Sequence, residues 1–210
     1  QILRDESPDL PVSVDTFRSD VARMAVEEYG ASMINDISGG GLDPAMYRTM
    51  AELQVPYILM HMKGDPKPMQ QQASYSDVPL EVIDYFAQRV GQLLELGVHD
   101  IILDPGFGFS KTTAQNYELL AQLGSLVEAF TQPLLVGVSR KSMIYRPLGI
   151  TPEEALSGTT FVHALALERG AKILRVHDVR PAVEAVQLYE ELRRFLRTDG
   201  ALHYQHLRPL

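Results

Sequence analysis

The sequence predicts an α/β fold in which helices cover a parallel sheet, and two observations support it. Short apolar runs alternate along the chain with longer stretches of helical periodicity. The short runs are apolar throughout, and strands buried on both faces of a sheet have this pattern. Two architectures remain open at this level: an open, doubly wound sheet and a (β/α)8 barrel.

Six apolar runs are predicted to be strands. They are residues 11–14, 32–34, 56–60, 101–103, 134–138 and 172–176. The first run is followed by Asp15-Thr16-Phe17-Arg18, so the glycine-rich turn of a dinucleotide-binding sheet is absent there.

The stretches between the runs carry helix start and stop signals. The predicted helices are residues 17–29, 45–53, 80–96, 155–169 and 180–196. Gly30 and Gly97 are typical residues just beyond a helix end. Asp43 before Pro44 predicts a capped helix start. Residues 151–154 (Thr-Pro-Glu-Glu) have the pattern of a capping box.

Composition excludes several classes of protein. The chain has 210 residues, which suits one domain, and a formal net charge of -8, which argues against non-specific binding of nucleic acid. It has no cysteine, which excludes disulfides, thiolate metal sites and cysteine nucleophiles. No apolar run approaches the ~20 residues of a membrane span, and no signal segment opens the chain. We expect a cytoplasmic location and no membrane partner.

Polar residues follow every predicted strand at its carboxyl end. They are Asp15, Asn35 with Asp36, His61, Asp104, Ser139 to Ser142, and Arg175 with His177 and Asp178. Any one of them is compatible with a turn or a helix cap. Because ligands bind at the carboxyl ends of parallel strands, the set as a whole favours a binding site.

Asp15, Asn35 and Asp104 admit two interpretations. They suit metal coordination or acid–base chemistry, and they equally suit recognition of a polar ring. A carboxylate accepts two N–H bonds from an amino-pyrimidinone edge, and Asn35 both donates and accepts, which fits a pterin or a guanine. A zinc site built by the protein is not expected, because no His-x-x-x-His spacing occurs. The residues alone leave metal and ring open.

Arg175 and His177 are two residues apart on a predicted strand, so they share a face and suit a phosphate or pyrophosphate. The alternative is a surface pair, or Arg175 bound to a structural carboxylate. Lys141 and Ser142 follow Gly137 at the carboxyl ends of the predicted strands, a region called the mouth below. A basic side chain there would balance buried carboxylates. The alternative there is a solvated helix start.

Residues 104–111 (Asp-Pro-Gly-Phe-Gly-Phe-Ser-Lys) combine a carboxylate, two glycines and two aromatic rings. This pattern favours a ligand wall, with one ring folded under as a core plug. Residues 39–41 and 63–79 are interpreted as flexible loops above the same mouth, the second as a lid or a disordered loop. His61 and His163 are interpreted as structural.

Five motifs occur in the order found in the dihydropteroate synthase family, which this chain resembles over residues 12–197. They are Ser-Val-Asp-Thr at 13–16, Ile-Asn-Asp-Ile-Ser-Gly at 34–39, Asp-Pro-Gly-Phe-Gly-Phe at 104–109, Gly-Val-Ser-Arg-Lys-Ser at 137–142 and Arg-Val-His-Asp at 175–178. The methyltetrahydrofolate-corrinoid methyltransferases share the pterin-binding barrel but not the Ser-Arg-Lys-Ser segment.

The resemblance implies a (β/α)8 barrel that condenses 6-hydroxymethyl-7,8-dihydropterin pyrophosphate with p-aminobenzoate, giving 7,8-dihydropteroate and pyrophosphate in folate biosynthesis. It also implies Mg²⁺ on the leaving pyrophosphate, sulfonamide inhibitors in the p-aminobenzoate pocket, and a homodimer formed through helices at 155–169 and 180–196.

The resemblance assigns roles to ten residues. Those expected at the pterin are Asp15, Asn35, Met60, Asp104, Gly137 and Lys141. Those expected at the pyrophosphate are Arg175 and His177. Those expected at p-aminobenzoate are Phe109, Lys141 and Ser142. Asp104 and Lys141 are expected to be catalytic, because an anion near the ring stabilises the cationic methylene that forms when pyrophosphate leaves.

The sequence departs from the family in one respect. The motifs of the family's first two strands are absent, so we expect about six of eight strand–helix units, in a barrel domain at 1–197 followed by a tail at 198–210. The magnesium ligand is expected in the absent strands, so no metal ligand is assigned here. Two alternatives stay open: a non-catalytic pterin-binding fragment, and an enzyme like the corrinoid methyltransferases.

Overall fold

The computed structural model describes residues 5–64 and 74–196. Their strands are β1 (Ser13–Asp15), β2 (Met33–Asp36), β3 (Tyr57–Met60), β4 (Ile101–Asp104), β5 (Leu135–Val136) and β6 (Ile173–Leu174). All pairings are parallel, and a bridge from Leu103 to Leu134 joins β4 to β5, so the strands neighbour one another in chain order. The six predicted strands are therefore confirmed, with boundaries that differ by at most two residues.

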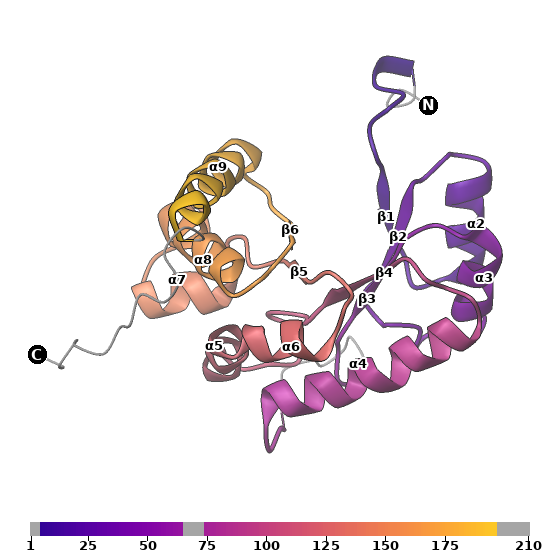
Figure 1. Cartoon of the computed structure of the whole chain (residues 1–210), viewed down its shortest axis with the longest axis horizontal. Helices are drawn as coiled ribbons and strands as arrows, with labels where there is room; N and C mark the ends of the chain where they lie inside the picture. The colour runs from indigo at the N-terminus through magenta and orange to yellow at the C-terminus, as the bar shows by residue number, and fades with distance from the viewer. Residues whose placement is uncertain (1–4, 65–73, 197–210) are drawn as a thin grey trace, which may run out of the picture.

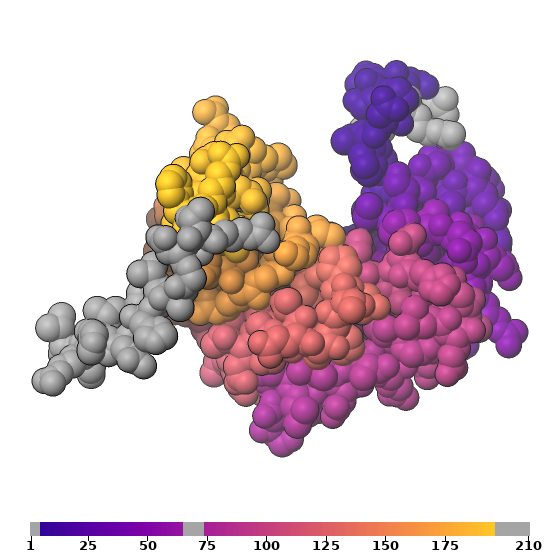
Figure 2. Space-filling view, viewed as in Figure 1, coloured from indigo at the N-terminus to yellow at the C-terminus, as the bar shows by residue number. Residues whose placement is uncertain are grey.

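The helices lie outside the strands. They are α2 (Ser19–Glu27), α3 (Met46–Leu53), α4 (Val78–Glu95), α5 (Thr113–Ala121), α6 (Leu123–Ala129), α7 (Ser142–Leu148), α8 (Leu156–Glu168) and α9 (Val179–Leu196). In Figure 1 they follow one another in an arc whose ends do not meet. Figure 2 shows a hollow between the yellow α9 and the indigo amino-terminal residues. Within the described residues no pairing joins β6 to β1. The predicted barrel class is confirmed, with the barrel open on this side.

Three helices were missed by the sequence prediction: α5, α6 and α7. The start of α5 is well marked, because Thr112 and Gln115 cap each other's backbone N–H groups. The other two have seven residues each, too few to show helical periodicity. Within the described residues, no helix has both the length and the apolar character needed to cross a membrane.

Two predicted helix-capping patterns and one predicted loop differ in detail from the structure. Helix α8 begins at Leu156, because residues after Thr151 form turns although Glu154 accepts the Thr151 N–H at 2.9 Å. Helix α3 begins at Met46. Asp43 Oδ1 accepts from the Ala45 N–H just before this helix, and Asp43 Oδ2 accepts from the Ser19 N–H at the start of α2. The loop predicted at 63–79 ends at 77, where α4 begins; its residues 65–73 lie outside the described part of the chain.

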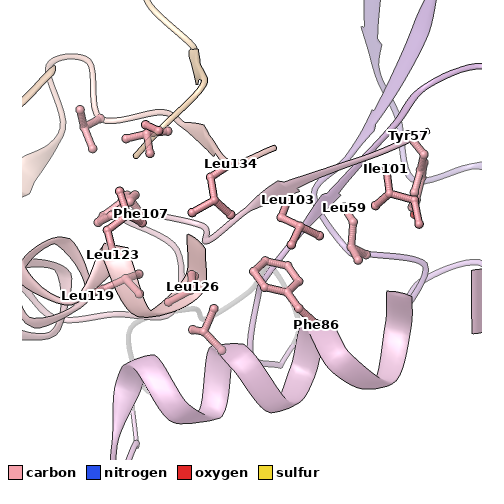
Figure 3. Close-up of a cluster of buried hydrophobic side chains, with 14 of the residues drawn as sticks. Tyr57, Leu59, Phe86, Ile101, Leu103, Phe107, Leu119, Leu123, Leu126 and Leu134 are labelled. Atoms are coloured by element: carbon pink, nitrogen blue, oxygen red, sulfur yellow. The ribbon is translucent and has the colours of Figure 1, made fainter. Parts of the chain in front are cut away.

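The core lies between the strands and the helix arc. Phe86 of α4 points at Leu59 and Leu103 in Figure 3, and all three side chains are fully buried. Burying one such side chain contributes about 1.5–3 kcal/mol. Phe107 is also fully buried, beside Leu119 (Figure 3), so it is the core plug of its loop, while Phe109 stays half-buried. The core thus fixes the base of the loop that carries Phe109.

Candidate active site

The carboxyl ends of the strands bring distant polar residues together. Asn35 donates to Asp15 Oδ1 at 2.8 Å, joining the ends of β1 and β2. Arg175, which follows β6, donates to Asp15 Oδ2 at 2.7 Å across the open side of the barrel. Burial raises the pKa of Asp104, and the nearby positive charges of Lys141 and Arg175 oppose this, so these groups lie at the same end of the strands.

Arg175 forms an ion pair with Asp15, one of the two alternatives that the sequence left open. The two side chains are 54% and 53% exposed. A pair this exposed contributes about 0–1 kcal/mol. Breaking this ion pair therefore costs little free energy, so Arg175 can exchange Asp15 for an anionic ligand. Without a ligand, the pair keeps Arg175 at the mouth.

Asn35 has an unused acceptor. Its side chain is buried, its amide nitrogen donates to Asp15, and its Oδ1 has no partner within the described residues. A buried acceptor left without a hydrogen bond costs about 1–3 kcal/mol. A ligand with an N–H group would remove that cost, as a polar ring does.

Asp104 is the most deeply buried carboxylate of the mouth after Asp36. It is 7% exposed, and its Oδ1 accepts from the Gly106 N–H at 2.8 Å. Burial raises the pKa of Asp104, opposed by the Gly106 N–H and by the charge of Lys141. Asp36 is used otherwise, because its oxygens accept from Tyr57 and from the loop after β2.

Lys141 points into the mouth from the residue before α7. Its Nζ donates to the carbonyl of Phe107 and lies 4.8 Å from the ring centroid of Phe109. Burial lowers the pKa of Lys141 to about 8, and Asp104 opposes this. Lys141 therefore contacts the loop after β4 and acts on Asp104 through space.

The remaining predicted residues lie around this centre. Met60 is buried at the end of β3, and Ser142 is half-buried at the first turn of α7. His177 is exposed beyond β6, and its N–H donates to Ser139 Oγ at 3.3 Å. A Cβ on Gly137 would meet Arg175 Cβ at 3.6 Å, so Arg175 fills the space beside this glycine.

Sequence reasoning gave two basic residues no specific role. Arg140 donates to both oxygens of Asp178, at 2.8 and 3.0 Å, and so ties the segments after β5 and β6 together. Lys111 is 8% exposed and contacts His61. Lysine side chains are mostly exposed to solvent in proteins. The only sequence signal for burial of Lys111 is therefore its position directly after a glycine-rich loop.

The described residues contain no group of three or more His, Cys, Asp or Glu side chains that could hold a metal ion. Both oxygens of Asp15 are engaged by protein donors. These described residues therefore do not form a metal site by themselves.

Comparisons with known proteins place most of this chain in one family. Residues 1–177 match the family model described as pterin binding enzyme. Dihydropteroate synthase of Escherichia coli (strain K12) is 43% identical over 181 residues, which are 85% of this chain and 63% of the relative. The chain thus spans less than two thirds of that relative's length.

Two solved structures show the same fold. Yersinia pestis dihydropteroate synthase in a sulfonamide drug complex has a TM-score of 0.86 at 37% identity, covering 92% of this chain and 70% of that one. Thermus thermophilus dihydropteroate synthase in complex with 6HMPPP has a TM-score of 0.84 at 38% identity, covering 89% and 74%. The resemblance seen in the sequence motifs is confirmed.

Proposed function

This chain belongs to the pterin binding enzyme family, and we propose that the protein containing it is a dihydropteroate synthase. It condenses 6-hydroxymethyl-7,8-dihydropterin pyrophosphate with p-aminobenzoate, giving 7,8-dihydropteroate and pyrophosphate. The observation that carries the proposal is the convergence of Asp15, Asn35, Asp104, Lys141 and Arg175 at one end of the strands. These are the positions at which the family's motifs match.

The pterin lies over Asn35 and Asp104. Asn35 Oδ1 accepts a ring N–H, which supplies the partner that this buried atom lacks. Asp104 faces the ring as a buried anion. When the C–O bond to pyrophosphate breaks, the pterin methylene becomes cationic, and a carboxylate already fixed in place stabilises that charge without reorganisation.

The second substrate enters beside Phe109 and Lys141. The Lys141 ammonium and the Phe109 ring form a cationic and aromatic border that suits a flat aromatic amine bearing an acid group. Its amine nitrogen attacks the methylene, a C–N bond forms, and the nitrogen releases one proton. No nucleophilic side chain is required. Sulfonamides fit the same border because they share the aromatic amine.

The assay that tests the proposal measures pyrophosphate release by the full-length protein. Release should require both the pterin pyrophosphate and p-aminobenzoate. Tight pterin binding without release would support a non-catalytic pterin-binding protein, and dependence on a corrinoid partner would support a methyltransferase. Mg²⁺ as cofactor and a cytoplasmic location remain predictions.

We also propose that further strand–helix units of the full-length protein close the barrel. The edges of β1 and β6 face the open side, and a hollow of about 530 Å³ between β6 and α9 is lined by apolar side chains, including Leu174, Val176 and Val183. A parallel sheet is normally covered on both faces, so these surfaces suit additional chain.

Arg175→Ala should weaken binding of the pterin pyrophosphate about 10- to 100-fold, since charge-assisted hydrogen bonds contribute about 1.5–3 kcal/mol. A pterin without phosphates should bind with less than about a threefold change, because Arg175 pairs with Asp15 only weakly. Calorimetry with both ligands measures the difference.

Arg180→Ala is the matched control, because Arg180 is a highly exposed arginine of α9 that pairs with Glu184. It should leave both affinities unchanged. Equal losses of the two ligands in Arg175→Ala would contradict the assignment of Arg175 to the pyrophosphate.

A homodimer through α8 and α9 is proposed from the apolar outer face of these helices. A groove of about 830 Å³ runs between them, and a second hollow of about 600 Å³ adjoins it at Phe161. Phe161 is 64% exposed and Leu188 is 74% exposed. A two-fold interface needs a projection and a recess on the same surface, and Phe161 beside these hollows provides both.

Leu188→Glu should convert the full-length protein from dimer to monomer, because the interface would bury an unpaired carboxylate. Light scattering during size-exclusion chromatography measures the mass. Leu80→Glu, on the exposed side of α4, is the control and should stay dimeric. A dimeric Leu188→Glu variant, or a monomeric parent, would disprove this interface.

A further inference from the structure

Lys111 carries a buried ammonium whose neighbours accept hydrogen bonds. Its Nζ lies 3.0 Å from His61 Nδ1, 2.9 Å from the Pro105 carbonyl oxygen and 3.1 Å from that of Gly106. The Phe109 carbonyl oxygen is 3.3 Å away. These four acceptors surround a side chain that is only 8% exposed.

The hydrogen-bonding groups around Lys111 suit a protonated lysine and a neutral histidine. An ammonium has three N–H groups for these acceptors, whereas a neutral amine would turn its lone pair toward one of them. Burial lowers the pKa of Lys111 to about 7, opposed by Asp104 and reinforced by Lys141. Burial also lowers the pKa of His61 to about 2, so the ring is neutral and its Nδ1 can accept from the Lys111 ammonium.

The segment held in this way, residues 105–109, passes close to the end of β3. A Cβ on Gly106 would lie 2.0 Å from the His61 carbonyl oxygen, so only glycine fits this approach. From the other side, the Gly108 N–H donates to Asn116 Oδ1 at 2.7 Å. Lys111 binds the segment's carbonyl groups, and Asn116 binds one of its N–H groups.

The same segment makes the contacts of Lys141. The Phe107 carbonyl accepts from Lys141 Nζ, and the Phe109 ring lies beside that nitrogen. A Cβ on Gly108 would meet Lys141 Cδ at 3.0 Å. A shift of residues 105–109 would therefore move both Phe109 and Lys141, while Asp15 and Asn35 sit on separate strands.

We propose that Lys111 is a positioning residue for the aromatic-amine substrate: its ammonium holds residues 105–109 against His61 and so places Phe109 and Lys141. The inference rests on the proposed function and extends it to a residue outside the family motifs quoted above. Lys111 acts through the loop, so its loss should affect one substrate more than the other.

Lys111→Met removes the ammonium and keeps the length of the side chain. In the full-length protein it should raise the KM for p-aminobenzoate at least about tenfold, while the dissociation constant of a pterin without phosphates rises by a clearly smaller factor, because Asp15 and Asn35 lie on separate strands. Lys172→Met, at an exposed lysine, is the control and should change neither. A loss of general stability would weaken both substrates alike.

A second variant and a binding assay keep the test decisive. Lys111→Gln keeps two N–H donors without a buried charge, and it replaces Lys111→Met if that variant fails to fold. It should raise the KM for p-aminobenzoate by a smaller factor than the loss of all donors would. Sulfonamide binding, measured by calorimetry, should weaken in step with that KM whether or not the protein releases pyrophosphate. Unchanged KM and sulfonamide affinity in a folded variant, or equal losses for both substrates, would overturn the inference. Absent pyrophosphate release in the parent would instead overturn the proposed function.

Discussion

Lys141→Ala in the full-length protein should lower kcat/KM at least about a thousandfold, the largest loss expected of any single substitution considered. Lys141 contacts the Phe107 carbonyl, lies beside the Phe109 ring and acts on the charge of Asp104. Truncation removes the cation from the substrate border and leaves Asp104 with less compensation in a buried position. Steady-state assays of pyrophosphate release measure the loss.

The pH dependence of activity in the unsubstituted protein tests whether the lysine ammonium groups favour the reaction. The pKa of Lys111 is about 7 and that of Lys141 is about 8, both lowered mainly by burial, so activity should fall as pH rises through these values. Arginine keeps its charge at every accessible pH. In Lys141→Arg the fall in activity near pH 8 should therefore be absent, while the fall near pH 7, which belongs to Lys111, should remain. Near-parental rates in Lys141→Ala, or an unchanged decline in Lys141→Arg, would contradict a role for the Lys141 ammonium.

The strands and the residues at their ends were predictable because both signals are local. An apolar run followed by Asp, Asn or Arg shows where a buried strand reaches the mouth, and this sufficed for Asp15, Asn35 and Asp104. Parallel topology then places all such ends on one side. The chemistry of the mouth follows from these residue types without any knowledge of the turns between them.

The partners of these residues were not predictable, because they depend on contacts between distant parts of the chain. Arg175 and Asp15 are 160 positions apart, and the sequence left Arg175 free to bind a phosphate or a carboxylate. Phe107 and Phe109 stand on either side of Gly108, and only packing decides that Phe107 enters the core. Lys111 was missed because burial of a lysine requires four acceptors from two different loops.

Asp104→Asn should act on activity and stability in opposite directions. Burial raises the pKa of Asp104, so the folded protein holds this carboxylate less favourably than the unfolded chain does. That cost is complete above the raised pKa of Asp104 in the folded protein, and it disappears as pH falls to the ordinary pKa of an aspartate. Asparagine is neutral at every pH and keeps an oxygen for the Gly106 N–H. The variant should therefore have a Tm higher by about 2 to 4 °C for each kcal/mol recovered.

The same change should reduce kcat about 100- to 1000-fold, because the neutral amide cannot stabilise the cationic methylene as the carboxylate does. The pterin should still bind, since asparagine keeps both shape and polarity. The acid limb of the parent's pH profile, which should lie above the ordinary aspartate pKa, should be absent from the residual activity. Asp84→Asn is the control, because Asp84 is an exposed aspartate of α4, away from the strand ends. If Asp104→Asn kept its kcat, the charge of Asp104 would have no part in the reaction. A lower Tm would mean that the carboxylate stabilises the fold. Only a lower kcat together with a higher Tm identifies Asp104 as a site residue whose charge destabilises the folded state.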